Sequence, residues 1–491
     1  MSKILNNING LVSRRSVLGG LGAGVAWPVW ADAIAQSPRP MQRVAVAHGP
    51  GALIEQAKLG GVIGYAVADA VTGQILESVE ADRMMPPASV AKVVTALFGL
   101  EVLGPEHRFA TRVLRLGPVS AGRLDGDLVL SGGSDPTLDS DTLGDLVAAL
   151  AATGLRQVTG RFLVCTGPLP QRDRIAPDQP DHLGYDPAVS GLCLNFNRVN
   201  FIWKRAGKSW DINMVAEGER FFPKVLMARM DVVDRDVPLF TYAAEAGVER
   251  WTVASTALGE AGSRWLPVRQ PAVYAGEVFA SLCRSQGIDL RPAEVVDTVP
   301  ETAVEVVRRD SDDLAKVLKG MLRFSTNLTA EVVGLAATGA GTQAGSAAVV
   351  TDWAQRRFGV AGHFADHSGL GSATRISARD MLAVVLGARG GALAGLLHET
   401  GLADAKGKEV KDNPVRVLAK SGTMNFVSGL AGYIEPPSGR RLAFAMFMAD
   451  VPRREAVLLA DREEPEGNEA WVKRARRLQQ QMLRRWVQEF G

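Results

Sequence analysis

The stretch that decides the fold is residues 86–94, PPASVAKVV, which opens an apolar run with the composition of a helix. Ser89 and Lys92 stand three residues apart in it. On a helix, positions i and i+3 share a face, so the lysine can take the proton of the serine hydroxyl if burial or a second cation keeps the amine neutral. Free backbone N–H groups at the helix start add positive potential beside Ser89. The pair therefore predicts a serine acyl-enzyme.

Size and composition indicate a globular chain with more than one domain. The 491 residues are 46% hydrophobic and 22% charged, and single cores stop growing near ~250–300 residues. A formal net charge of +2 lacks the basic excess of a nucleic-acid-binding protein. Cys165, Cys193 and Cys283 are too few for a disulfide scaffold, and whether two of them pair stays open.

The N-terminal residues have the pattern of an export signal. Arg14 and Arg15 precede an apolar, Gly-rich stretch at 17–30, and small-residue A-x-A sites follow at 31–35. Paired arginines before such a stretch are typical of a bacterial twin-arginine signal peptide. The run is short and Gly-rich for a membrane span, although an uncleaved anchor is the alternative. We expect residues 1–35 to be removed and the mature protein to work in the periplasm.

The predicted elements fall into two ends and a middle. The ends have a strand hairpin at 62–79, helices at 312–324, 328–338, 345–358, 378–388 and 469–490, and strands at 418–423, 429–434 and 442–449. The middle has strands at 109–116, 127–130, 161–165 and 302–308, helices at 142–152 and 275–285, and a loop-rich region between them. We predict an α+β fold in which 42–108 and 300–491 form an antiparallel sheet flanked by helices, with 109–299 inserted.

Two further motifs give the serine–lysine pair its expected partners. Ser325 and Asn327 lie between two predicted helices, in RFSTNL. Ser325 can relay a proton, and Asn327 can hydrogen-bond Lys92 and a substrate amide. Taken alone, the same residues could simply cap a helix, since Ser and Asn are good caps.

The third motif is Lys420-Ser421-Gly422-Thr423, on a predicted strand. Lys420 supplies positive charge, and Gly422 lets a substrate backbone come close to the strand. An extended peptide can pair with that strand edge, and the backbone N–H groups of Ser89 and Thr423 can form an oxyanion hole. The hydroxyls of Ser421 and Thr423 can bind a terminal carboxylate. The ordinary alternative is a strand end without a catalytic role.

In this order, S-x-x-K, S-x-N and K-[ST]-G form the signature of penicillin-recognising enzymes. The chain resembles the D-alanyl-D-alanine carboxypeptidase/endopeptidase group of class C low-molecular-mass penicillin-binding proteins, with their β-lactamase/transpeptidase-like domain. The resemblance also rests on the long stretch between the first two motifs, on GDLVLSGGSDPTL at 126–138, on LNFN at 194–197 and on DHSGL at 366–370. His367 and Ser134 stand where the family usually has Gly, and Ser421 where Thr is commoner.

The resemblance implies a role for each matching position. Ser89 would be the acylated nucleophile and Lys92 the general base, with Ser325, Asn327 and Lys420 completing the catalytic set. Asp366 and Ser368 would line the cleft beside the substrate-binding residues of the third motif. The implied activity is that of a serine D-Ala-D-Ala carboxypeptidase or endopeptidase on peptidoglycan stem peptides, with β-lactams as covalent inhibitors and no metal or cofactor.

Two rival functions stay open on sequence grounds: a serine β-lactamase or SxxK esterase, and an inactive peptidoglycan-binding protein. The long insertion disfavours the first and the intact motifs disfavour the second. Asp366-His367-Ser368 spells a catalytic triad, but sequence neighbours converge poorly in that geometry. The last predicted helix has an apolar stripe and a basic face, so we expect it to pack on the sheet, with peripheral membrane contact as the alternative. The balance of carboxypeptidase to endopeptidase activity and the oligomeric state are not determined by the sequence.

Overall fold

A computed structural model describes residues 49–245, 247–404, 410 and 412–491. Pro50–Gly491 forms one compact unit. The predicted signal peptide at 1–35 lies outside the described residues. Across the part that is described, no helix combines the length and the apolar composition that a bilayer span needs.

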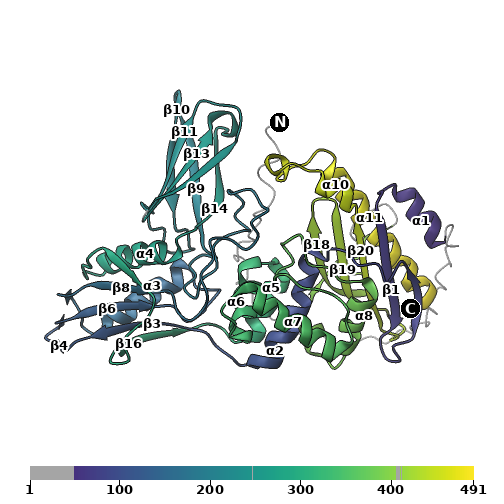
Figure 1. The fold of residues 1–491 in the computed structure, drawn as a ribbon, viewed down its shortest axis with the longest axis horizontal. Coiled ribbons are helices and arrows are strands. Elements are labelled where there is room, and N and C mark those ends of the chain that lie inside the picture. The colour runs from purple at the N-terminus through teal and green to yellow at the C-terminus, as the bar shows by residue number, and fades with distance from the viewer. Residues whose placement is uncertain (1–48, 246, 405–409, 411) are drawn as a thin grey trace, which may run out of the picture. The chain divides into compact units, whose positions relative to one another are not determined.

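The sheet formed by the two ends is antiparallel, in the order β17-β18-β19-β20-β1-β2 (Figure 1). Its strands are β1 (Val62–Asp69), β2 (Ile75–Val79), β17 (His398–Glu399), β18 (Arg416–Met424), β19 (Val427–Glu435) and β20 (Leu442–Ala449). β1 pairs with β20, with Tyr65 opposite Met446. Strands from distant parts of the sequence therefore lie side by side, and the predicted α+β fold is confirmed.

Different helices cover the two faces of this sheet, because successive strand residues point to opposite faces. In β1, Tyr65 and Val67 join a core with α1 (Pro50–Ala57) and α11 (Asn468–Phe490). Ala66 and Ala68 join the core on the other face. The helices of that second core are α2 (Lys92–Leu103), α5 (Leu314–Phe324), α6 (Asn327–Thr338), α7 (Gln343–Phe358), α8 (Ala378–Gly387) and α9 (Ala392–Leu396).

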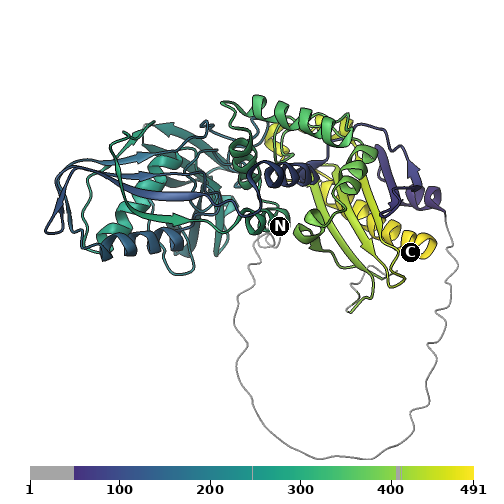
Figure 2. The ribbon, with the colours of Figure 1, turned by 90° about the horizontal axis from the view of Figure 1, so that it is seen from below.

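The C-terminal helix α11 packs on the sheet, as expected. Its apolar stripe is buried against β19 and β20, and both Figure 1 and Figure 2 show the helix beside these strands. The stripe consists of Trp471, Ala475, Leu478, Met482 and Trp486. These side chains are part of the core and are not available to a lipid surface.

A second sheet lies in the middle of the sequence, in the order β15-β8-β6-β3-β16. β6, β8 and β15 run parallel, whereas β3 pairs antiparallel with β6 and β16 pairs antiparallel with β3. The elements are β3 (Ala110–Leu116), β6 (Asp127–Ser131), β8 (Phe162–Cys165), β15 (Ala293–Val296), β16 (Val304–Asp310), α3 (Ser140–Ala152) and α4 (Pro271–Ser285), with a small sheet of β4 (Val119–Ser120), β5 (Arg123–Leu124) and β7 (Gln157–Val158). α3 and α4 share a core with one face. The limits 109 and 299 of the insertion stay a prediction.

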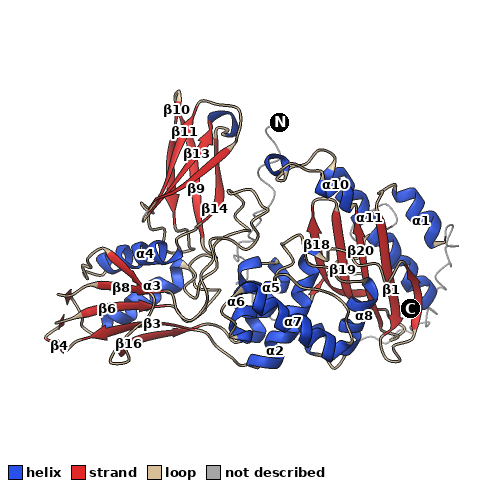
Figure 3. Cartoon of the chain, viewed as in Figure 1, coloured by secondary structure: helices blue, strands red, loops and turns tan. Residues whose placement is uncertain are grey.

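The loop-rich interpretation is wrong for residues 198–267, which form two three-stranded sheets (Figure 3). The strands are β9 (Arg198–Ala206), β10 (Ser209–Val215) and β14 (Ala261–Pro267) in one, and β11 (Ala228–Val233), β12 (Phe240–Glu245) and β13 (Val248–Ala254) in the other. No residue of β12 is fully buried, and its apolar face consists of Phe240 and Tyr242, which pack against the core. An alternation of two apolar side chains is a weak sequence signal for a strand.

Candidate active site

Ser89 lies in a short 3-10 helix, and not in the α-helix that follows it. This segment, Ala88–Ala91, precedes α2, which begins at Lys92. The prediction of one continuous helix is therefore wrong at its first turn. In a 3-10 turn residues i and i+3 eclipse each other, which brings Lys92 directly to the serine. The Lys92 Nζ–Ser89 Oγ distance is 2.8 Å.

Lys92 is fully buried and connects three segments of the chain. Besides Ser89, its Nζ donates to Asn327 Oδ1 at 2.7 Å and to the backbone carbonyl of Ser368 at 2.7 Å. Burial, followed by the positive charge of Lys420, lowers the pKa of Lys92 well below its ordinary value, and nearby carboxylates only partly oppose this. A neutral amine at this position can accept a proton from Ser89.

The second motif sits where α5 ends and α6 begins. Ser325 takes a left-handed backbone conformation with φ of +58° as the C-cap of α5. Such a conformation costs a non-glycine residue about 1–3 kcal/mol and often marks functional sites. Asn327 is the first residue of α6, and its Nδ2 donates to the backbone carbonyl of Tyr185 at 2.9 Å. The turn thus brings the side chain of Asn327 to Lys92 and the side chain of Ser325 to Lys420.

Lys420 reaches the second motif from β18. Its Nζ donates to Ser325 Oγ at 3.1 Å and to the backbone carbonyl of Ser421 at 2.6 Å. The side chain is almost completely buried, and this desolvation lowers the pKa of Lys420 to about 8. The structure therefore brings together all five predicted catalytic residues, Ser89, Lys92, Ser325, Asn327 and Lys420. Their catalytic roles stay a prediction.

Gly422 is packed against the nucleophile segment. A Cβ on Gly422 would lie 2.6 Å from the carbonyl oxygen of Pro87 and 2.9 Å from the backbone nitrogen of Ser89. Only glycine allows this approach of β18 to the serine. Ser421 and Thr423 flank it and are exposed, as a substrate-binding role requires. β17 pairs only with Leu418 and Ala419, so this strand does not extend along the third motif.

The loop at 366–370 supports Lys92 from behind. The carboxylate of Asp366 accepts the backbone N–H groups of Gly369 at 2.5 Å and of Gly371 at 2.6 Å. Asp366 and Ser368 are both buried. Their observed contacts shape the loop that presents the Ser368 carbonyl to Lys92, and a direct contact with substrate stays a prediction.

The apparent triad at 366–368 does not form. His367 Nε2 pairs with Ser346 Oγ at 2.7 Å and not with its neighbour Ser368. Burial lowers the pKa of His367 to about 4, so the ring is neutral near pH 7. The ring packs on Gly334, where a Cβ would lie 2.2 Å from it. Gly334 thus provides the space for the His367 ring.

Sequence reasoning missed Glu331, which lies under the loop. Its carboxylate accepts the backbone N–H groups of His367 at 3.2 Å and Ser368 at 2.9 Å, and Gln343 Nε2 donates to it at 2.9 Å. Burial raises the pKa of Glu331, and the nearby Lys92 opposes that effect. One signal could have found it: Glu331 follows Asn327 by four residues, which places both on one face of a helix that begins at Asn327.

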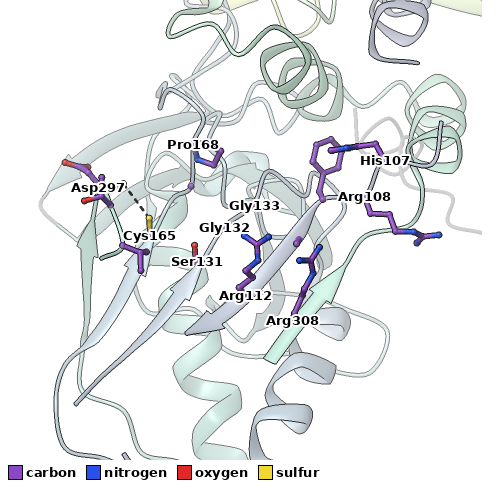
Figure 4. Close-up of a pocket in the computed structure, with 15 residues that line it drawn as sticks. His107, Arg108, Arg112, Ser131, Gly132, Gly133, Cys165, Pro168, Asp297 and Arg308 are labelled. Atoms are coloured by element: carbon purple, nitrogen blue, oxygen red, sulfur yellow. Dashed lines mark hydrogen bonds between the residues drawn. The ribbon is translucent and has the colours of Figure 1, made fainter. Parts of the chain in front are cut away.

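A pocket of about 530 Å³ lies elsewhere, on the five-stranded sheet (Figure 4). Arg112 and Arg308, which line it, stand opposite each other on β3 and β16. Arg112 pairs with Glu305 at 3.2 Å and Arg308 pairs with Asp310 at 2.7 Å, so both arginine charges are already balanced. None of the predicted site residues lines this pocket. It is therefore not the candidate active site.

The described residues contain no group of three or more His, Cys, Asp or Glu side chains placed to hold a metal ion. Cys165, Cys193 and Cys283 are all free and buried. No two of them form a disulfide. Burial raises the pKa of the Cys283 thiol to about 12, which makes a thiolate nucleophile there unfavourable. The reactive groups that the site offers are thus the serine hydroxyls and the two lysines.

Comparisons with known proteins bear on the family and the fold of this chain. A family model described as the D-Ala-D-Ala carboxypeptidase 3 (S13) family matches residues 51–464. The chain is 29% identical over 436 residues to a D-alanyl-D-alanine carboxypeptidase of Actinomadura sp., with 80% of this chain and 79% of the relative covered. The crystal structure of penicillin binding protein 4 (dacB) from Haemophilus influenzae has a TM-score of 0.73 at 20% identity, covering 90% of this chain and 99% of that chain.

A second crystal structure of the Haemophilus protein, complexed with a novel β-lactam, has a TM-score of 0.67 at 20% identity over 88% of this chain and 99% of that chain. These structures share the fold of this chain. The family model spans most of the sequence and includes all three motifs. The chain therefore belongs to the D-Ala-D-Ala carboxypeptidase 3 (S13) family.

Proposed function

We propose that this D-Ala-D-Ala carboxypeptidase cleaves peptidoglycan stem peptides through an acyl-enzyme on Ser89. The observation that carries the proposal is the buried Lys92, whose Nζ lies 2.8 Å from Ser89 Oγ and 2.7 Å from Asn327 Oδ1. A desolvated amine with a second cation nearby is a suitable general base at neutral pH. No other serine among the predicted site residues combines these features.

Acylation starts when the neutral amine of Lys92 takes the proton of Ser89 and the serine oxygen attacks the penultimate D-alanyl carbonyl. The C–N bond of the terminal residue then breaks, and the ester on Ser89 forms. We assign to Ser325, which is hydrogen-bonded to Lys420, the relay of this proton from Lys92 to the leaving amine. Water hydrolyses the ester and returns the proton to the site. Cleavage of a cross-link follows the same steps with a different leaving amine.

The carbonyl oxygen becomes negatively charged during the attack and needs hydrogen-bond donors close to it. We assign this role to the backbone N–H groups of Ser89 and Thr423. The close packing of Gly422 on the Ser89 backbone supports this assignment, because it places the strand beside the nucleophile. An extended stem peptide would then add to the edge of β18.

β-Lactams should trap the same serine. Attack on the lactam carbonyl opens the ring, but the amine that leaves stays tethered to the acyl group and continues to occupy the site. The β-lactam complex of the Haemophilus protein, which has the same fold, supports this expectation. A β-lactamase would instead hydrolyse the adduct rapidly.

The test is to incubate the purified protein with penicillin and measure its intact mass. One equivalent of adduct is expected on the wild type and none on Ser89→Ala, while a peptide ending in D-Ala-D-Ala should release D-alanine only with the wild type. An adduct that persists in Ser89→Ala would overturn the choice of nucleophile. Rapid penicillin turnover without any D-alanine release would favour a β-lactamase.

We also propose that the protein is exported to the periplasm by a twin-arginine signal. The pair Arg14-Arg15, the following mild apolar stretch and the A-x-A sites support this location. Peptidoglycan, the proposed substrate, is in the same compartment. Replacing both arginines by lysine should leave the precursor inside the cell, as measured by fractionation, and normal export of that variant would contradict the proposal.

A further inference from the structure

A cation from the C-terminal helix lies at the third motif. Arg476 Nη2 donates to Thr423 Oγ1 at 3.3 Å, and both residues are exposed. The guanidinium has five N–H donors in a planar fork that matches a carboxylate. No carboxylate among the described residues forms an ion pair with Arg476, whereas many other arginines of this chain have such a partner. Its charge and most of its donors are therefore available.

The backbone position of Arg476 is set by buried neighbours on α11. Ala475 and Leu478 are in the core, and Gln479 Nε2 donates to Ser428 Oγ at 3.0 Å. Ser428 is the register partner of Thr423 across β18 and β19. The same turn of α11 is thus fixed to the strand pair that carries the third motif. The placement of Arg476 at Thr423 follows from this packing.

Lys420, the other cation of the motif, is already occupied. It is almost completely buried, and its amine donates to Ser325 and to the Ser421 carbonyl. A substrate that pairs with the edge of β18 would lie beside the exposed guanidinium of Arg476. In a carboxypeptidase the group one residue beyond the scissile carbonyl is a free carboxylate, which is the group that an unpaired guanidinium beside a hydroxyl binds best.

We propose that Arg476, together with Thr423, binds the carboxylate on the carbon next to the scissile amine and so selects leaving groups that carry this carboxylate. The inference rests on the proposed function and adds a specificity residue to it. Arg476 does not touch the scissile bond, so it affects substrate binding and orientation and leaves the chemistry at Ser89 unchanged. A leaving amine whose carbon carries no carboxylate, such as the side-chain amine of a lysine in a cross-link, gains less from it.

The test uses two depsipeptides that differ only in the leaving group. One ends in D-Ala-D-lactate and the other in D-Ala-D-lactamide, so both have a reactive ester and only the first has a carboxylate. Arg476→Gln should lower kcat/KM for the lactate substrate by roughly 10–100-fold, the usual range for a hydrogen bond to a charged group, mainly through KM. The lactamide substrate should change less than about twofold, and Arg476→Lys should recover part of the loss.

Arg477→Gln is the matched control. Arg477 is the sequence neighbour of Arg476 and is also exposed, but it has no hydrogen bond to the third motif. This variant should leave both substrates unaffected, and melting temperatures of all variants should agree. An equal loss on both substrates, or no loss on the lactate substrate, would overturn the inference. Failure of the proposed function has a different signature, because the wild type itself would then release no leaving group and form no penicillin adduct.

Discussion

Glu331 accepts the backbone N–H of Ser368 at 2.9 Å, and the carbonyl of Ser368 accepts Lys92 Nζ at 2.7 Å. A buried carboxylate is therefore connected to the proposed general base through one residue. It acts on Lys92 in two ways, by orienting that carbonyl and by its charge, which raises the pKa of the lysine against the stronger lowering by burial.

Replacing Glu331 by Gln tests this connection. The amide keeps an acceptor for Ser368 but removes the charge, so the pKa of Lys92 should fall and the acid limb of kcat/KM for D-alanine release should move to lower pH. We expect kcat to drop by up to about tenfold, the value of one hydrogen bond, because the loop is less well held. Glu294→Gln, a variant of an exposed glutamate on β15, should keep the wild-type profile. An unmoved acid limb would mean that Glu331 carries no charge during catalysis.

The alkaline limb of the pH profile should belong to Lys420. Burial lowers the pKa of Lys420 to about 8, and a lysine whose charge is needed loses function as the pH rises through its pKa. We therefore expect kcat/KM to fall with an apparent pKa of about 8. In Lys420→Arg the guanidinium stays protonated, so the alkaline limb should disappear although the rate is lower. Persistence of that limb in the variant would assign it to another group.

The contact between Gly422 and the nucleophile segment predicts a local and severe effect of one methyl group. In Gly422→Ala the new Cβ would be 2.6 Å from the Pro87 carbonyl oxygen and 2.9 Å from Ser89 N. Overpacking of this kind typically costs about 1–3 kcal/mol, and here it separates β18 from Ser89. We expect penicillin acylation to slow at least 100-fold, a loss of about 2.7 kcal/mol in the barrier.

The matched control is Gly320→Ala in α5, where nothing lies within 4 Å of the new Cβ. Alanine is a better helix former than glycine, so this variant should be more stable by about 0.5–1 kcal/mol and acylate at the wild-type rate. The comparison is made by stopped-flow acylation and urea unfolding. Equal acylation rates for the two variants would show that the close approach at Gly422 is not required.

The sequence was informative where the chain repeats a simple period. The strand and helix patterns at both ends predicted one antiparallel sheet flanked by helices, and the structure adds that β1 and β20 pair within it. The three motifs predicted that Lys92, Asn327 and Lys420 would converge. The middle of the chain carried less information, because a strand such as β12 has only two partly buried apolar residues, Phe240 and Tyr242, to reveal it.

Glu331 was missed for a different reason. In the sequence it is one acidic residue in an apolar helical run, and its importance appears only when the loop at 366–370 packs on α6 and presents two backbone N–H groups to it. Tyr185 is a similar case, since it contributes a backbone carbonyl to Asn327 and any residue type could do so. Contacts made by backbone groups, or completed by a distant loop, have no local sequence signal.

The ring of His367 packs directly on Gly334. A Cβ at position 334 would lie 2.2–2.4 Å from atoms of the His367 ring, so Gly334→Ala alone should destabilise the protein by about 1–3 kcal/mol and displace the loop that positions Lys92. His367→Ala alone loses the contact with Ser346 and leaves a cavity. In the double variant the new methyl group enters that space. The two changes should therefore be non-additive by at least about 1 kcal/mol, as measured by urea unfolding, with penicillin acylation partly restored relative to Gly334→Ala. Additive losses would show that the ring and the glycine do not depend on each other.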